Sequence, residues 1–116
     1  MEQNAVAVEP DFKKAINGLM PVAIVDVDTN ELLTLAWTDP EGFRLTRECG
    51  EVVLWARSRW ERWHKGATSG NIQKVVQIFI DCEGNSLKYV VKPAGPACHT
   101  GAKTCYSTEV EFQPKS

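Results

Sequence analysis

Five short runs of β-branched and aromatic residues constrain the fold of this 116-residue chain more than any other feature of its sequence. Runs of this composition, bounded by glycine, proline, asparagine and aspartate, are typical of β-strands. They cover residues 21–27, 31–37, 51–57, 74–81 and 86–92. Turn residues at 28–30 and 82–85 connect the first two runs and the last two, which predicts two hairpins. The chain should therefore be mainly β.

One segment has a helical pattern instead. Thr38-Asp-Pro-Glu41 places a capping threonine before a proline, with a glutamate at the capping-box position. We therefore expect Thr38 to cap a short helix that runs from about Asp39 to Glu48 and ends at Gly50. The polar, basic stretch at residues 58–71 is expected to form a functional loop. The expected fold class is α+β, predominantly β: a compact single domain of hairpins with one short helix.

The length is that of one domain, since most domains have about 100–150 residues. Residues 1–116 are expected to form this single domain, with a polar leader at 1–17 and a frayed tail at 113–116. Hydrophobic residues make up 43% of the chain and charged residues 24%, as in ordinary soluble proteins rather than disordered ones. The chain should fold.

The formal net charge of −2 gives no general positive field, so the composition does not support binding to nucleic acid or to an acidic membrane. The amino terminus has no positively charged region followed by an apolar one, as a signal peptide would, and no apolar stretch is long enough to span a bilayer. A cytoplasmic location is the simplest interpretation. In that reducing compartment, four cysteines are better explained as metal ligands or free thiols than as two disulfides.

Three of these cysteines stand at unusual spacings. Fifteen residues separate Cys82 from Cys98, and six separate Cys98 from Cys105, so the short CxxC pattern of common zinc fingers is absent. Three thiolates around zinc, with water in the fourth position, would be a catalytic arrangement. The alternative is a small core residue at a strand end and two loop thiols, which spacing alone favours. Cys49, at the end of the predicted helix, is likewise expected to have no metal-binding role.

Two histidines and an acidic turn offer further candidates. His99 could be a metal ligand, a general acid or base, or a loop histidine, and its position beside Cys98 favours the acid–base role. His64 is better explained as a loop histidine that faces solvent. Asp81, Glu83 and Asn85 alternate around the second hairpin turn, where oxygen ligands could meet one Mg²⁺, although acidic turn residues are more often simply solvated.

Basic residues gather in the predicted loop and just before it: Arg57, Arg59, Arg62 and Lys65. The glycines and hydroxyl groups of residues 66–70 follow them, and this combination suits a phosphate group. A basic surface loop is the plainer alternative. The tryptophans between the arginines could also stack on nucleic-acid bases, but the chain has no electrostatic track for that role.

Six segments occur in order along the chain: 18–26 (GLMPVAIVD), 31–46 (ELLTLAWTDPEGFRLT), 55–59 (WARSR), 63–71 (WHKGATSGN), 81–85 (DCEGN) and 95–106 (GPACHTGAKTCY). Each alone is a weak signal, but together they resemble the phosphoribosyl-AMP cyclohydrolase family of histidine biosynthesis. The resemblance implies hydrolysis of N1-(5-phosphoribosyl)-AMP, in which zinc-activated water adds at C6 of the adenine ring and the N1–C6 bond breaks.

The resemblance also implies an intertwined homodimer whose subunits share zinc. Cys82 of one subunit would then join Cys98 and Cys105 of the other. His99 would handle a proton, because opening the ring requires protonation of the departing nitrogen. The phosphate and ribose groups of the substrate would bind Arg57, Arg59, Lys65, Thr68 and Ser69.

The acidic turn departs from the family, which usually has Asp-Cys-Asp-x-Asp where this chain has Asp81-Cys82-Glu83-Gly84-Asn85. The zinc cysteine is kept, but Glu83 is one methylene longer than aspartate and Asn85 removes one negative charge. Magnesium binding by Asp81, Glu83 and Asn85 is therefore an open question. Two alternative functions remain: a paralogue acting on another purine-like substrate, and a noncatalytic, zinc-stabilised dimeric binding protein.

Overall fold

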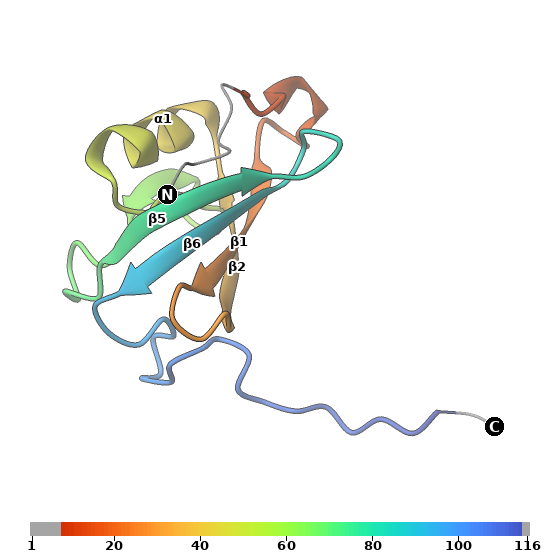
Figure 1. Cartoon of the computed structure of the whole chain (residues 1–116), viewed down its shortest axis with the longest axis vertical. Coiled ribbons are helices and arrows are strands. Elements are labelled where there is room, and N and C mark those ends of the chain that lie inside the picture. The colour runs from red at the N-terminus through yellow and green to blue at the C-terminus, as the bar shows by residue number, and fades with distance from the viewer. Residues whose placement is uncertain (1–7, 115–116) are drawn as a thin grey trace.

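The computed structural model describes residues 8–114, which form a four-stranded sheet, a two-stranded ribbon and one α-helix (Figure 1). The helix is α1 (Pro40–Cys49), and a short 3-10 helix covers Phe12–Lys14. The strands are β1 (Met20–Asp26), β2 (Leu32–Thr38), β3 (Val53–Ala56), β4 (Glu61–His64), β5 (Gln73–Ile80) and β6 (Leu87–Pro93). The predominantly β, α+β fold class is confirmed.

The four strands of the main sheet lie in the order β2-β1-β6-β5. Both predicted hairpins are confirmed, because β1 pairs antiparallel with β2 and β5 pairs antiparallel with β6. Parallel pairing of β1 with β6 joins the two hairpins into one sheet. This arrangement leaves β2 and β5 at the two edges.

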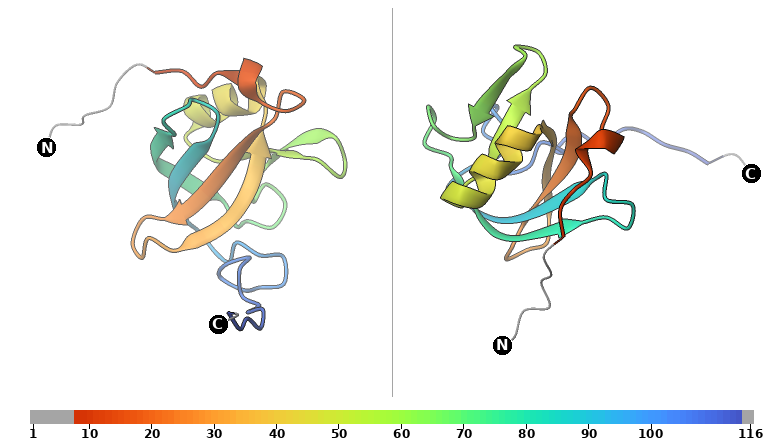
Figure 2. Two further views of the ribbon diagram at one scale, coloured as in Figure 1. Left: turned by 90° about the vertical axis from the view of Figure 1, so that its right-hand side faces the viewer. Right: turned by 90° about the horizontal axis from the view of Figure 1, so that it is seen from above.

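One face of the sheet is covered by α1 and β3 (Figure 2). Phe43 on the helix and Leu54 on β3 belong to the same buried cluster as Ile24 and Tyr89 of the sheet. Burying an apolar side chain of this size contributes about 1.5–3 kcal/mol. The layered core therefore gives a stable support for the loops at its margins.

The predicted helix is confirmed, but its predicted cap is wrong. Asp39, not Thr38, is the N-cap: its backbone is extended, and its side chain accepts a hydrogen bond from the Gly42 backbone N–H at 2.9 Å. The proline at the first helical position explains the shift, because it fixes the helix start immediately after Asp39. Thr38 is instead fully buried at the end of β2. Gly50 ends the helix as expected, in the left-handed conformation with φ of 73°.

The prediction that residues 58–71 form only a loop is also wrong. Residues 61–64 form β4, which pairs antiparallel with β3 from Val53↔His64 to Ala56↔Glu61. His64 is thus a strand residue, and its Nε2 lies 2.7 Å from Glu51 Oε1. Since β4 is short and mostly exposed, its sequence lacks the apolar alternation that identifies a half-buried strand.

The two chain ends were expected to be a polar leader and a frayed tail. Residues 1–7 and 115–116 lie outside the described residues. The described part of the leader contains the 3-10 helix, and residues 106–114 are extended without regular secondary structure. Among residues 8–114, no helix is long and apolar enough to cross a membrane.

Candidate active site

A pocket of about 630 Å³ lies where three parts of the chain meet. Its walls come from β2, from the β3–β4 ribbon with the loop that follows it, and from the loop at residues 96–105. The pocket brings together seven of the residues predicted from the sequence: Arg57, Lys65, Thr68, Ser69, Cys98, His99 and Cys105. Residues far apart in the chain thus converge on one cavity of a size that suits a small molecule.

The two cysteines of the loop are neighbours in this pocket. Cys98 Sγ accepts a hydrogen bond from Thr100 Oγ1 at 3.1 Å. The hydroxyl and backbone of Thr100 are the main causes that lower the pKa of Cys98. A hydrogen bond with the Cys105 thiol and the positive charge of Lys65 lower this pKa further, whereas burial raises it. A lower pKa favours the thiolate of Cys98, and cysteine sulfurs are the ligands that soft metals prefer.

Backbone contacts fix the positions of the two thiols. The Cys105 N–H donates to the Leu33 carbonyl of β2 at 2.7 Å, and the Cys98 N–H donates to the Ala102 carbonyl at 3.2 Å within the loop. Lys65 Nζ donates to the Ala97 carbonyl at 3.0 Å, which ties the end of the ribbon to the same loop. The thiols are therefore held by the sheet and the ribbon together.

A buried carboxylate anchors the other side of the loop. Asp26, at the end of β1, lies 3.3 Å from Lys103 Nζ, and Lys103 also lies 3.2 Å from Glu31. The Asp28 backbone N–H, which donates to Asp26 at 2.8 Å, is the main cause that lowers the pKa of Asp26. Lys103 lowers it as well, and desolvation opposes both.

Aromatic rings support the two cations of the pocket. The Arg57 guanidinium lies 4.4 Å from the centre of the Trp37 ring, and Lys65 Nζ lies 5.5 Å from the centre of the Trp63 ring. Both tryptophans line the pocket. A wall of this kind offers positive charge to a phosphate and flat apolar faces to a base.

Two glycines allow the loops around the pocket to come close. A Cβ atom on Gly66, whose φ is +86°, would lie 2.4 Å from the Asn71 carbonyl carbon and the Ile72 nitrogen. A Cβ on Gly95 would lie 2.3 Å from Asn71 Oδ1. Asn71 thus fits between two glycine positions, where any side chain would push the pocket walls apart.

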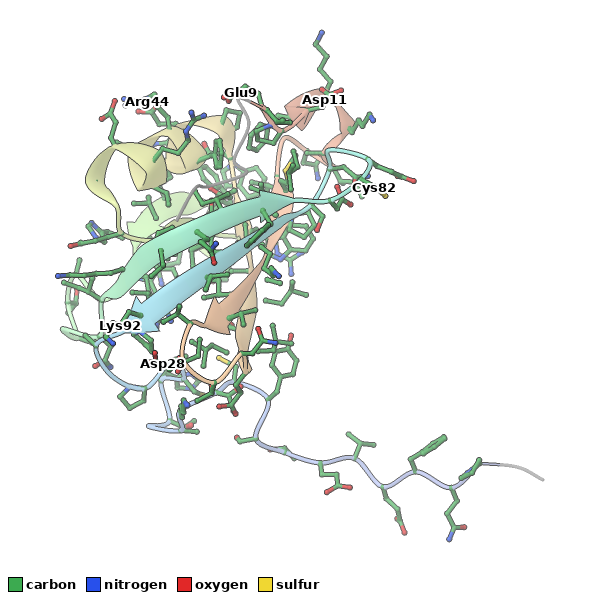
Figure 3. All side chains as sticks on the ribbon, viewed as in Figure 1. Glu9, Asp11, Asp28, Arg44, Cys82 and Lys92 are labelled. Carbon is green, nitrogen blue, oxygen red and sulfur yellow. The ribbon has the colours of Figure 1, made fainter. Side chains whose placement is uncertain are left out.

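Two groups of predicted site residues lie outside this pocket. Arg59 pairs with Glu61 at 2.9 Å on the exposed ribbon. Cys82 lies in the turn between β5 and β6, at the end of the sheet opposite Asp28 and Lys92 (Figure 3). A seven-residue strand such as β6 spans about 20 Å, so Cys82 is far from the loop that follows that strand.

One acidic residue of this turn, Asp81, stabilises its backbone. Asp81 Oδ1 accepts a hydrogen bond from the Asn85 N–H at 2.9 Å, and with its amide turned toward Asp81, Asn85 also donates to Oδ2 at 2.8 Å. Glu83 is exposed. Within residues 8–114 of a single chain, no group of three or more histidine, cysteine, aspartate or glutamate side chains is placed to hold a metal ion.

Trp37 is a pocket residue that the sequence interpretation missed. It lies in a predicted strand, where a tryptophan is as well explained by core packing, and only the approach of Arg57, the residue after β3, reveals its place in the wall. Asn71 is a second example. Its position between Gly66 and Gly95 was signalled only by the two glycines, which are far apart in the sequence.

A smaller hollow of about 360 Å³ lies between residues 9–12 and α1. Among the described residues that line it there is no cysteine or histidine, and its arginines are neutralised. Arg44 pairs with Glu41 at 2.6 Å and Arg47 with Glu9 at 2.7 Å. The reactive side chains thus belong to the larger pocket.

The fold and the larger pocket define a small β domain in which two cations and two tryptophans line a cavity beside a pair of thiols. A sequence profile described as phosphoribosyl-AMP cyclohydrolase matches residues 34–107. The chain belongs to the phosphoribosyl-AMP cyclohydrolase family.

Individual relatives agree with this assignment. The chain is 44% identical to a phosphoribosyl-AMP cyclohydrolase of Lactiplantibacillus plantarum over 91% of its own length and 97% of the relative. It is 48% identical to one of Cenarchaeum symbiosum, over 84% of the chain and 90% of the relative. It is also 47% identical to a histidine biosynthesis bifunctional protein of Halalkalibacterium halodurans, over 80% of the chain but 44% of that longer protein.

Proposed function

We propose that the protein is a phosphoribosyl-AMP cyclohydrolase, a hydrolase of histidine biosynthesis that opens the adenine ring of N1-(5-phosphoribosyl)-AMP at the N1–C6 bond. The supporting observation is the pocket that combines Cys98, His99 and Cys105 with the cations Arg57 and Lys65. A doubly phosphorylated nucleotide needs the cations to bind its phosphate groups, and opening its ring needs the reactive groups beside them. The relatives named phosphoribosyl-AMP cyclohydrolase support the same activity. We place it in the cytoplasm, where reduced thiols persist.

The neighbouring thiols of Cys98 and Cys105 fit a zinc ion, because both are soft ligands and the pKa of Cys98 is lowered. When bound, zinc would lower the pKa of water at the site to near 7 and so supply a nucleophile. The third ligand would be Cys82 of a second subunit. This thiol is exposed and lies at the far end of its own sheet, so it is free to reach another chain.

The residues of the pocket would divide the remaining work. Arg57 and Lys65 would bind the phosphate groups, and the hydroxyls of Thr68 and Ser69 would donate to phosphate or ribose oxygens. The ring faces of Trp37 and Trp63 would confine the adenine between the cations and the thiols. Arg59 could join the phosphate-binding cations only by leaving its partner Glu61.

His99 would move the proton. Its side chain lines the pocket directly after Cys98, so it lies beside the reacting ring when the substrate is bound. A proton held on this imidazole could pass to N1 as the N1–C6 bond breaks, which is the step at which the leaving nitrogen gains negative charge.

A magnesium ion would take Asp81, Glu83 and Asn85 as its protein ligands. Asp81 already accepts hydrogen bonds from Asn85, so Mg²⁺ would compete with them, and only Glu83 has a free carboxylate in the turn. Magnesium binds through oxygen ligands and usually keeps several waters. We therefore expect Mg²⁺ to bind weakly, so that its effect on turnover needs a high Mg²⁺ concentration.

One assay tests the proposal. Purified, zinc-loaded protein is incubated with phosphoribosyl-AMP, and the ultraviolet change of ring opening is followed with increasing Mg²⁺. We expect turnover that rises with Mg²⁺, and a control without zinc should be inactive. Zinc-loaded protein that is folded but shows no turnover at any Mg²⁺ concentration would refute the cyclohydrolase and leave the two alternatives, a paralogue acting on another purine-like substrate and a noncatalytic dimer.

A further inference from the structure

The chain after Cys105 has the pattern of a β-strand but no strand partner among the described residues. Tyr106, Thr108, Val110 and Phe112 alternate with Ser107, Glu109, Glu111 and Gln113. This period of two is typical of a strand with one buried face. Yet Val110 is 81% exposed and Phe112 80% exposed, and the segment extends away from the body of the protein (Figure 1). We call residues 106–112 the arm.

The β5 edge of the main sheet is open over part of its length. Its first residues already contact the segment before β3: the Val52 N–H donates to the Gln73 carbonyl at 3.0 Å, and the Val75 N–H donates to the Gly50 carbonyl at 2.8 Å. Beyond them, the described residues provide no partner for Val76–Ile80 on the side away from β6. Val76 is 53% exposed and Phe79 46% exposed. An apolar, unpaired edge of this kind is a template for an added strand.

The other edge of the sheet is less available. Thr104 Oγ1 donates to the Leu32 carbonyl of β2 at 2.7 Å, and the Cys105 N–H donates to the Leu33 carbonyl at 2.7 Å. The middle of β2 lines the candidate active site. An arm that added to this edge would close the pocket.

The shared zinc of the proposed function relates the arm of one subunit to β5 of the other. Cys82 lies two residues after the end of β5, and the arm begins directly after Cys105. A zinc ion bound by Cys105 and by Cys82 of a second subunit would bring the start of the arm to the end of that subunit's β5. The arm leads away from the ion, whereas β5 leads toward it, so the two segments would run antiparallel.

The arm and the open edge of β5 also match in length and in charge. The open edge Val76–Ile80 has five residues, or about 17 Å of strand, and the first five residues of the arm cover the same span. Beyond that span, Glu111 would approach the start of β5, where Lys74 lies opposite Lys92 on β6. An acidic side chain would relieve the repulsion of these two facing lysines.

We propose that the arm adds to the Val76–Ile80 edge of β5 in a second copy of the chain, as an antiparallel strand, and so fastens the dimer beside each active site. This inference rests on the shared zinc of the proposed function. Main-chain hydrogen bonds would provide the pairing, and the exposed apolar side chains of both segments would lose contact with water.

Hydrogen exchange of the full-length, zinc-loaded protein tests the arm. We expect the Val76–Ile80 amides to exchange at least about tenfold more slowly in the wild type than in a Val110→Glu, Phe112→Glu variant. The dimer of that variant should dissociate at least about tenfold more readily. Ile16→Glu is the matched control, because Ile16 is also exposed but lies outside the arm, and it should leave both quantities unchanged.

Equal exchange of Val76–Ile80 in the wild type and the double variant would overturn the proposal. Protection that persists when the wild type is diluted to monomers would overturn it as well, because the arm would then pair with its own chain. Turnover of phosphoribosyl-AMP, measured on the same wild-type sample, reports on the proposed function separately. An active wild type with an unprotected β5 edge would refute the arm alone.

Discussion

Replacing Gly66 with alanine should destabilise the protein by two separable effects. The first is conformational, because Gly66 has φ of +86°, and an L-residue in this region costs about 1–2 kcal/mol. The second is steric, because the new Cβ would lie 2.4 Å from backbone atoms of Asn71 and Ile72, which cannot turn away as a side chain could. Overpacking of this kind costs about 1–3 kcal/mol, so we expect a total of about 2–5 kcal/mol.

Gly70→Ala is the matched control for this substitution. Gly70 has nearly the same conformation, with φ of +83°, but a Cβ there would meet nothing within 4 Å. Gly70→Ala should therefore show only the conformational cost of about 1–2 kcal/mol. The difference between the two variants, about 1–3 kcal/mol, measures the close contact with Asn71.

Denaturant unfolding at one fixed protein concentration provides the free energies, since the stability of an oligomer depends on concentration. Gly66→Ala should also raise KM, because Gly66 lines the candidate active site and its displacement would move Thr68 and Ser69. Equal destabilisation by the two substitutions would refute the argument that the loops need this close approach.

Three further predictions follow from the site. His99→Ala should lower turnover by about 100-fold or more while the zinc content, measured by atomic absorption, stays at the wild-type level; parallel loss of both would mean a ligand or structural role. Asp26→Asn should destabilise the protein near neutral pH. The Asp28 N–H and Lys103 lower the pKa of Asp26 in the folded protein. The contribution of Asp26 to the free energy of unfolding is therefore present above the unfolded pKa and is lost as pH falls through the folded pKa. Urea unfolding should show the stabilities of the variant and the wild type converging in acid, and a difference that stays constant with pH would contradict this. Removing zinc with a chelator should lower the melting temperature and weaken the dimer, because a ligand that binds only the native state stabilises that state. A metal-free dimer with unchanged stability would tell against a metal at the interface.

The sequence predicted those parts of the fold that local patterns encode. The β1–β2 and β5–β6 hairpins follow from alternating apolar residues around short turns, and Gly50 marks the helix end because a left-handed residue is needed there. The cap was misplaced by one residue, since both Thr38 and Asp39 can cap a helix and only the proline position distinguishes them. The parallel pairing of β1 with β6 joins residues 65 positions apart, such as Val22 and Leu87, and no local pattern specifies it.

The candidate site was predictable to a similar degree. Residue type and order identified Cys98, His99, Cys105 and Lys65, and the fold brings them to one pocket. Trp37 and Asn71 were missed because their roles depend on neighbours from other segments. Arg59 has the residue type of a phosphate ligand, but the ribbon turns it toward Glu61 and away from the pocket.

The shared active site can be tested by mixing two inactive variants. A Cys82→Ser subunit keeps Cys98 and Cys105, and a Cys98→Ser subunit keeps Cys82, so a mixed dimer would contain one intact site. Random assembly makes half of the dimers mixed, each with one of its two sites intact, so coexpression should restore about one quarter of the wild-type turnover of phosphoribosyl-AMP. Coexpression of Cys98→Ser with Cys105→Ser should restore none, because both ligands come from the same subunit at each site. Turnover of the first mixture that stays at the level of the separate variants would contradict the shared zinc site.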